Sequence, residues 1–260
     1  SRVSPATNSA DPYILPLTFF DLLWLKLHPI ERVTFYRLTD PSRDSFYSLI
    51  LPKLEQSLSL VLTHFTLLSG HLKWDPQDPK PRVVVFPNDA VSLTVAETDA
   101  DFSHISSRGL RLETELRALV PELSVSSDSA SVLSLQITFF PNRGFSIGTT
   151  VHHVVMDGKT AAKFHKSWAH LCKYGTIPQD FHLPTLLDRT VINVPAGLEQ
   201  KIFELLPYLS EDNESARTLK LPPAKDFDDV VRVTLELTQE KVEKLKERAK
   251  NESTRFMDTF

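Results

Sequence analysis

Apolar residues recur at spacings of three and four between Ser42 and Phe65, and this pattern predicts a helix over the segment. Pro52 lies inside the run and has no backbone N–H to donate, so we expect a kink there. The positions that would share one face of the helix are Phe46, Ile50, Leu54, Leu58, Val61 and Phe65.

Two short runs rich in valine follow the predicted helix. Arg82–Phe86 and Val91–Val95 are separated by a stretch that contains Pro-Asn-Asp. Valine favours strands, and Pro, Asn and Asp favour turns. The pattern therefore predicts two strands joined by a turn.

A second pair of runs is longer and leads into the segment with the most chemistry. Val132–Phe140 and Phe145–His152 flank Pro-Asn-Arg-Gly, where Gly144 can take the positive φ that tight turns often need. This pattern predicts a hairpin. Lys159–Lys173 then shows partial helical periodicity, and Gly175 is placed to end that helix.

The last third of the chain changes character. Residues 178–229 contain repeated prolines and interrupted apolar patches, which is typical of a long crossover between domains. Val230–Leu237 then alternates apolar and polar residues as a strand does, and Thr238 can cap a charged helix over Gln239–Lys250. We expect a domain at 1–177, a linker at 178–229, and the start of a truncated second domain at 230–260.

Composition restricts the class of protein. Apolar residues make up 41% and charged residues 24% of the 260 residues, values typical of globular chains. A formal charge of −4 gives no broad positive field for nucleic acid, so a small-molecule substrate is favoured. The sequence contains no run of 18 apolar residues and therefore predicts no membrane-spanning helix. Cys172 is the single cysteine, which favours a reducing compartment such as the cytoplasm and a packing role for the thiol.

The candidate chemistry lies where the second hairpin strand ends. His153 is followed by Asp157 and Gly158, and a neutral imidazole can take the proton of an attacking hydroxyl and return it to a leaving thiolate. Asp157 can fix the turn by hydrogen bonds or an arginine partner, and Gly158 allows close passage of backbone. His153 is thus a candidate general base, with Asp157 and Gly158 as structural members of the motif.

His152 is expected to have a different role from its neighbour. Successive strand residues face opposite sides, so a His153 that faces a cleft leaves His152 as a hydrogen-bonded core residue. The histidine and cysteine spacings do not resemble a zinc site, and there is no glycine-rich phosphate loop or Gly-x-Ser-x-Gly elbow. These patterns argue against metal catalysis, nucleotide hydrolysis and a serine hydrolase.

These residues resemble a known family. His153 to Gly158 is similar to the His-x-x-x-Asp motif of the plant BAHD acyltransferases. Leu15–Asp21, Leu68–Leu72 and Asp188–Thr190 resemble segments of the branch that malonylates phenolic and flavonoid glucosides. The similarity runs from Ser4 to about Arg255.

The resemblance implies a mixed α/β fold of two chloramphenicol-acetyltransferase-like domains, each with a mixed sheet flanked by helices, of which the second is largely missing here. It implies that acyl-CoA and acceptor meet at His153 in a channel between the domains, with Asp157 turned away and paired with an arginine. Malonyl-CoA would be the co-substrate and a glycosylated phenolic the acceptor, with no permanently bound cofactor and a monomeric full-length enzyme. Thr18, Asp21 and Arg189 are candidates for lining or bracing the channel, or for local hydrogen bonds alone.

Two other interpretations stay open at this point. His152 and His153 with Asp157-Gly158 also fit the His-His-x-x-x-Asp-Gly pattern of peptide-synthetase condensation domains. The family's Asp-Phe-Gly-Trp-Gly segment belongs to the second domain and is absent, which fits a non-catalytic remnant. We expect the isolated chain to be inactive, because the second domain would cover both the cleft and Val230–Leu237.

Overall fold

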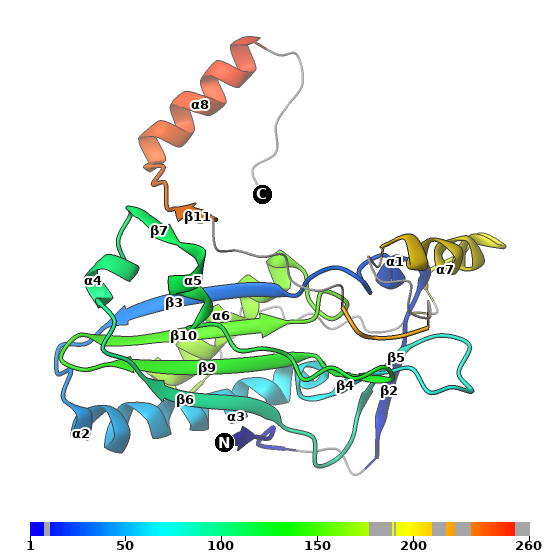
Figure 1. Cartoon of the computed structure of the whole chain (residues 1–260), viewed down its shortest axis with the longest axis horizontal. Helices are drawn as coiled ribbons and strands as arrows, with labels where there is room; N and C mark the ends of the chain where they lie inside the picture. Colours follow the sequence, from blue (N-terminus) through cyan, green and yellow to red (C-terminus); the bar gives the residue numbers. More distant parts are fainter. Residues whose placement is uncertain (8–10, 177–188, 190, 210–216, 222–229, 253–260) are drawn as a thin grey trace.

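A five-stranded mixed sheet forms the centre of the computed structural model, which describes residues 1–7, 11–176, 189, 191–209, 217–221 and 230–252 (Figure 1). Its first two neighbouring strands and its last three pair antiparallel, and β6 pairs with β9 in parallel. The strands, in spatial order, are β1 (Arg2–Val3), β6 (Val91–Glu97), β9 (Leu133–Phe140), β10 (Gly144–Val151) and β3 (Ile30–Arg37). The mixed sheet flanked by helices agrees with the expected α/β fold.

A second sheet contains the first of the two valine-rich strands. Its order is β2 (Tyr13–Pro16), β5 (Arg82–Val85), β4 (His71–Lys73) and β8 (Ser129–Ser131), all antiparallel. The two predicted valine-rich strands both form, but β5 and β6 lie in different sheets. A turn closed by Asp89 N to Phe86 O at 3.0 Å redirects the chain between them.

The predicted first helix forms as one nearly continuous element with a local change of pitch. It consists of α2 (Arg43–Ser45), a π-helical turn η1 (Phe46–Ile50) and α3 (Leu51–His64), and Leu51 N donates to Phe46 O. The wide turn directly precedes Pro52, whose missing N–H would leave an α-helical carbonyl unpaired. Five of the six predicted face positions are buried: Phe46, Leu54, Leu58, Val61 and Phe65.

The main core lies between one face of the large sheet and two helices. Both α3 and α6 (Gly158–Tyr174) pack there, with buried side chains such as Leu58, Phe139 and Phe164. Gly175 ends α6 as predicted, with φ of 74° and its N–H donated to Leu171 O at 2.8 Å. Cys172 is half-buried against this core. The other face carries a smaller cluster with α4 (Phe102–Ile105) and α5 (Glu113–Arg117).

The predicted hairpin is confirmed, with Gly144 opposite Phe140 and Val151 opposite Leu133. The positive φ falls on Asn142, at 61°, and not on Gly144. Gly144 is needed for space, because a Cβ there would collide with the backbone carbonyl of Tyr36 on β3. The glycine therefore permits close pairing of β10 with β3.

Residues 198–206 pack against the body of the fold, ahead of the strand and the projecting helix that follow. Helix α7 (Leu198–Leu209) lies within the predicted linker and buries Ile202 and Leu206 against α1 (Phe19–Leu22) and the second sheet. The predicted strand shortens to β11 (Val231–Val233), which pairs with β7 (Leu110–Leu112). Thr238 caps α8 (Gln239–Glu252) as predicted, accepting from Lys241 N at 3.3 Å.

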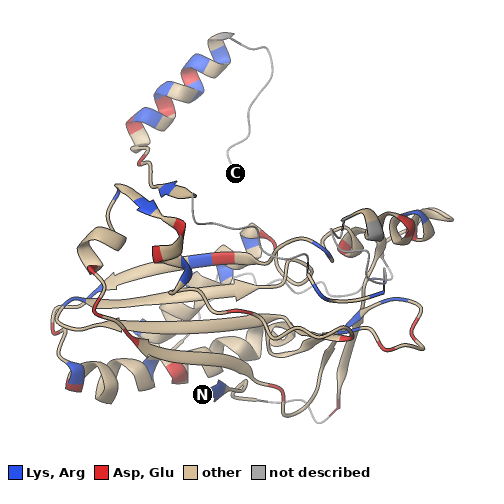
Figure 2. Cartoon of the chain, in the orientation of Figure 1, with Lys and Arg blue, Asp and Glu red and all other residues tan. Residues whose placement is uncertain are grey.

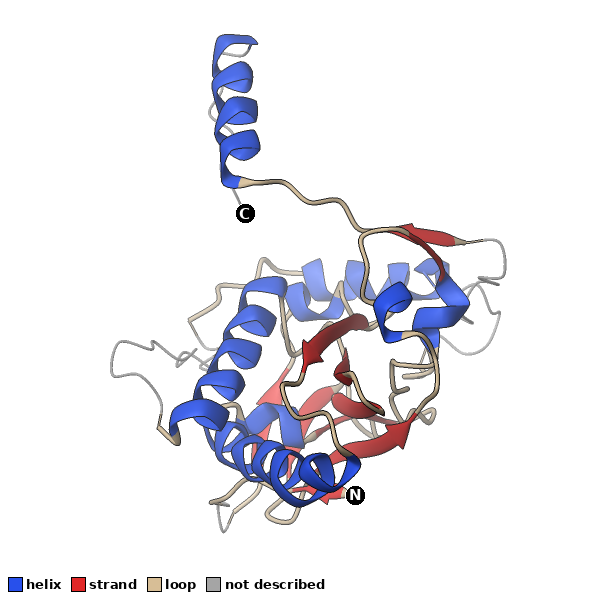
Figure 3. Cartoon of the chain, turned by 90° about the vertical axis from the view of Figure 1, so that its left-hand side faces the viewer, coloured by secondary structure: helices blue, strands red, loops and turns tan. Residues whose placement is uncertain are grey.

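Helix α8 projects away from the body and carries both signs of charge along its length (Figures 2 and 3). Beside it, the apolar side chains of β11 and the following residues are exposed, Leu235 by 80% and Leu237 by 61%. None of the helices in the described part of the chain is both long and apolar enough to cross a membrane.

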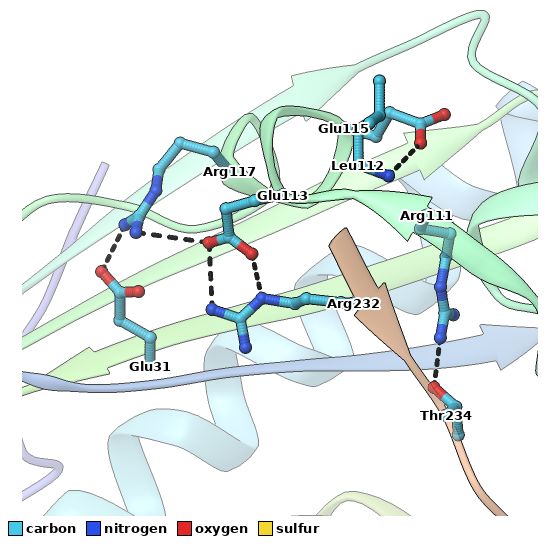
Figure 4. A network of polar contacts seen from close by, with 8 residues as sticks. All are labelled: Glu31, Arg111, Leu112, Glu113, Glu115, Arg117, Arg232 and Thr234. Carbon is cyan, nitrogen blue, oxygen red and sulfur yellow. Dashed lines mark hydrogen bonds and ion pairs between the residues drawn. The ribbon is translucent and has the colours of Figure 1, made fainter. Parts of the chain in front are cut away.

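A network of ion pairs fastens β11 to the body (Figure 4). Glu113 is 3% exposed in its side chain and accepts two bonds from Arg232 of β11, while Arg117 joins it to Glu31 of β3. Arg111 donates to Thr234 and to two carbonyl oxygens. Opposite charges therefore link β11, which follows the predicted linker, to α5 and through it to β3.

Candidate active site

The candidate base stands where β10 ends and the chain turns. His152 N donates to Val132 O at 2.9 Å, which extends the strand ladder by one residue, and Val155 N donates to His152 O at 3.2 Å, which closes the turn. α6 begins at Gly158. The predicted order of strand, sharp turn and helix is therefore present around His153.

The His153 ring stacks on an aromatic side chain that the sequence did not single out. Trp24 follows α1, and the two ring centroids are 4.4 Å apart with an interplanar angle of 10°. Both side chains are half-buried. The His153 nitrogens form no hydrogen bond with any residue that the structure describes. Trp24 lies in the apolar run Leu17–Leu27, but nothing in that run indicates a contact with a residue so far along the chain.

Thr18, Asp21 and Arg189 come together, and their contacts brace α1. Oδ2 of Asp21 accepts from the backbone N and from Oγ1 of Thr18, at 2.9 and 2.8 Å. Oδ1 of Asp21 accepts from Nη2 of Arg189 at 3.2 Å. The Asp21 side chain is 12% exposed. These three residues therefore hold the segment that carries Trp24.

Asp157 acts locally as the cap of α6. Its Oδ1 accepts from Thr160 N at 2.7 Å. The Thr160 side chain, with a smaller contribution from this backbone hydrogen bond, holds the pKa of the exposed carboxyl below its usual range. No arginine pairs with Asp157 in the described part of the chain, so the ion pair that the resemblance implied is not seen. The other expected role of Asp157, a hydrogen bond that fixes the turn, is present. At Gly158 a Cβ would meet no atom within 4 Å apart from its chain neighbours and the backbone of its own helix, so packing inside the protein does not require glycine there.

Replacing Asp157 by alanine should lower the free energy of unfolding by about 0.5–2 kcal/mol, the usual cost of a lost N-cap. Asp157→Asn should retain most of the stability, because asparagine caps about as well. Urea unfolding of the three proteins measures this. A loss for Asp157→Asn as large as for Asp157→Ala would show that the carboxylate charge, and not capping, stabilises the turn.

His152 is a core residue, as its place in the strand predicted. The ring is 1% exposed, and its Nδ1 accepts from Val154 N at 3.3 Å. Nε2 has no partner among the described residues. Burial, with a smaller contribution from the charge of His153, lowers the pKa of His152 to about 4. The ring therefore stays neutral near pH 7.

The buried His152 predicts a loss of stability in mild acid. Its pKa rises from about 4 in the folded chain to 6.5 in the unfolded chain, so the unfolded state takes up a proton first as the pH falls. Stability present above pH 6.5 should decrease toward pH 4, by about 3 kcal/mol from this residue. Urea unfolding at pH 7, 5.5 and 4 should show a shallower pH dependence for His152→Gln than for the unchanged chain. An exposed control, His64→Gln, should leave the slope unchanged; equal slopes in all three proteins would contradict the prediction.

A cavity elsewhere in the molecule does not include the candidate base. A cavity of about 620 Å³ lies between β3, α5 and β11, and His153 is not among the residues that line it. The described residues contain no group of three or more His, Cys, Asp or Glu side chains arranged to hold a metal ion.

Comparison with known proteins agrees with the fold and with the family resemblance. The model of the Transferase family matches residues 1–259. A BAHD acyltransferase of Arabidopsis thaliana is 79% identical over 256 residues, and this covers 98% of the chain and 57% of that protein. Vinorine synthase, a solved structure, has a TM-score of 0.55 and 25% identity over 75% of this chain and 46% of its own.

Two further relatives from Arabidopsis thaliana differ in the substrates that their names give. Agmatine coumaroyltransferase is 68% identical over 261 residues, covering 98% of the chain and 57% of that protein. Phenolic glucoside malonyltransferase 2 is 49% identical over 258 residues, covering 97% and 57%.

The chain belongs to the Transferase family, as an N-terminal portion of a BAHD acyltransferase. The family that the motif and its flanking segments indicated is confirmed. The chain spans a little over half the length of the curated relatives it matches.

Proposed function

We propose that this chain supplies the general base of a CoA-dependent acyltransferase, and that His153 is that base. The supporting observation is the half-buried His153 ring at the exit of β10, stacked on Trp24, with both nitrogens unbonded to the described residues. An imidazole placed in this way can accept a proton from a substrate.

The reaction needs one proton taken up and one returned. His153 removes the proton from an acceptor hydroxyl or amine while its oxygen or nitrogen attacks the thioester carbonyl of acyl-CoA. A tetrahedral intermediate then breaks its carbon–sulfur bond, and the imidazolium returns the proton to the departing CoA thiolate. Both substrates meet at one base, so no covalent acyl-enzyme is required.

Two pairs of substrates are candidates. The segments Leu15–Asp21 and Leu68–Leu72 support a malonyl donor and a sugar hydroxyl of a phenolic or flavonoid glucoside. The 68% identity to agmatine coumaroyltransferase, against 49% to the malonyltransferase, supports an aromatic acyl donor and an amine acceptor. We place the aromatic donor and amine acceptor first, because the sequence is more similar to that relative.

Two chimeras test the proposal. Each joins this chain to the remaining length of one relative, agmatine coumaroyltransferase or phenolic glucoside malonyltransferase 2. Each is assayed for release of free CoA thiol with coumaroyl-CoA or malonyl-CoA, and with agmatine or a phenolic glucoside. We expect the first chimera to have the higher kcat/KM with its own substrates, by about tenfold or more, because its two halves would match better.

The controls are the same chimeras with His153→Ala, and the isolated chain. Thiol release no faster in either chimera than in its His153→Ala form would favour the alternative, a non-catalytic remnant. Turnover by the isolated, monodisperse chain would contradict our expectation that the chain alone is inactive. A faster malonyl chimera would reverse the order of the two substrate pairs.

We also propose that the protein acts as a monomer in the cytoplasm. The single cysteine supports the reducing compartment. Light scattering of the active chimera and the location of a fluorescent fusion in plant cells test the two points; a stable dimer or a secreted fusion would refute them.

A further inference from the structure

The candidate base lacks the partner that usually holds a catalytic imidazole. In acid–base sites the second ring nitrogen is commonly hydrogen-bonded to a group that orients the ring. Among the described residues, no such group reaches His153. What holds the ring is the near-parallel indole of Trp24, with centroids 4.4 Å apart and planes within 10°.

We infer that Trp24 is the positioning residue for His153, and that it orients the imidazole by stacking in place of a hydrogen bond. The inference rests on the proposed function of His153. A parallel stack contacts the ring face, whereas both nitrogens lie at the ring edge. The stack therefore restricts tilt of the imidazole and leaves its nitrogens open to substrate.

Trp24 is itself firmly placed. Its neighbours Leu22 and Leu25 are fully buried, and its backbone N donates to Asp21 O at 3.1 Å. The Asp21 carboxylate is fixed in turn by Thr18 and Arg189. Phe20 contacts the indole edge to face, with centroids 6.3 Å apart. These contacts around α1 thus fix the indole in its stacked position against the His153 ring.

The indole also suits the charge that the reaction creates. When His153 takes the acceptor proton it becomes an imidazolium, and a cation over the face of an indole is attracted by the negative π surface. The face of the indole therefore suits both the resting ring, which it orients, and the cation that forms during attack.

The first measurement reads the stack without reference to activity. In the full chain with ¹³C-labelled histidine, the His153 ring signal is identified as the one lost in His153→Asn. We expect the indole ring current to shift this signal upfield, the shift to disappear in Trp24→Leu, and part of it to return in Trp24→Phe. A His153 signal at the same position in the unchanged chain and in Trp24→Leu would overturn the inference.

The second measurement is steady-state kinetics of the same Trp24 variants in the active chimera. Trp24→Leu should lower kcat by about 10- to 100-fold, as expected for a misoriented group, with KM for acyl-CoA changed less than about twofold. Trp24→Phe should restore kcat to within about threefold, because a ring remains to stack. Leu23→Ala, an exposed neighbour on the same segment, is the matched control and should have unchanged kcat.

The outcomes separate the two proposals. If His153→Ala abolishes turnover but Trp24→Leu has the kcat of the unchanged chimera, the positioning role is wrong and the base assignment stands. If His153→Ala is as active as the unchanged chimera, the base assignment fails and the positioning role fails with it. A large rise in KM with kcat unchanged would make Trp24 a binding residue and would also overturn the inference.

Discussion

Replacing His153 by alanine should lower kcat of an active chimera by about 10²–10⁴, which is the range for loss of a positioned general base. The ring is half-buried and forms no hydrogen bond with the described residues, so its removal should leave the free energy of unfolding nearly unchanged. Steady-state kinetics and urea unfolding of the same preparation measure the two effects together.

The matched control for this change is His64→Ala, at the exposed end of α3. It makes the same chemical change in the same chain and should leave kcat within about twofold, since exposed substitutions away from a site have small effects. Full activity of His153→Ala would refute the base assignment. A large loss of stability in His153→Ala would mean that the residue supports the fold, and that its loss of activity is indirect.

Replacing Phe164 by alanine should lower the free energy of unfolding by about 3–5 kcal/mol, the usual cost of removing a buried phenylalanine side chain. Phe164 is fully buried on α6. Its ring contacts that of Phe65, at the end of α3, edge to face with centroids 5.5 Å apart. Urea unfolding monitored by circular dichroism measures the loss.

Phe86→Ala provides the comparison at an exposed site, because Phe86 is 45% exposed and lies in the turn after β5. Its cost should be at most about 1 kcal/mol. Equal losses for the two variants would mean that α6 does not pack as the structure has it. The position of the helix that follows His153 would then be in doubt.

Local patterns in the sequence predicted the elements well, because they record which residues share a face. The spacing from Phe46 to Phe65 gave a correct helix, and the turn before Gly144 gave a correct hairpin. The wide turn before Pro52 follows from the missing N–H. Membership of β5 and β6 in different sheets could not be predicted, because it depends on partners far away in the chain.

The candidate site shows the same division. The motif placed the candidate base, His153, at a strand exit, and the facing argument correctly assigned His152 to the core. The stack with Trp24 joins residues more than a hundred positions apart, and no local pattern records such a contact. Asp157 could pair with a nearby backbone N–H or a distant arginine, and the structure has the nearby one.

The antiparallel pairing of β3 with β10 affects how the protein folds during its synthesis on the ribosome. Ile30 lies opposite Val151, so β3 emerges more than a hundred residues before its partner. At ordinary rates of synthesis this interval is on the order of ten seconds, far longer than the collapse of a small chain. During that time β3, whose Ile, Val, Phe and Tyr side chains are interspersed with polar ones, waits without its partner strand. A nascent chain in this state is a natural client for chaperones. Slower translation between the two strands should therefore increase the demand for chaperones, while the finished fold remains the same.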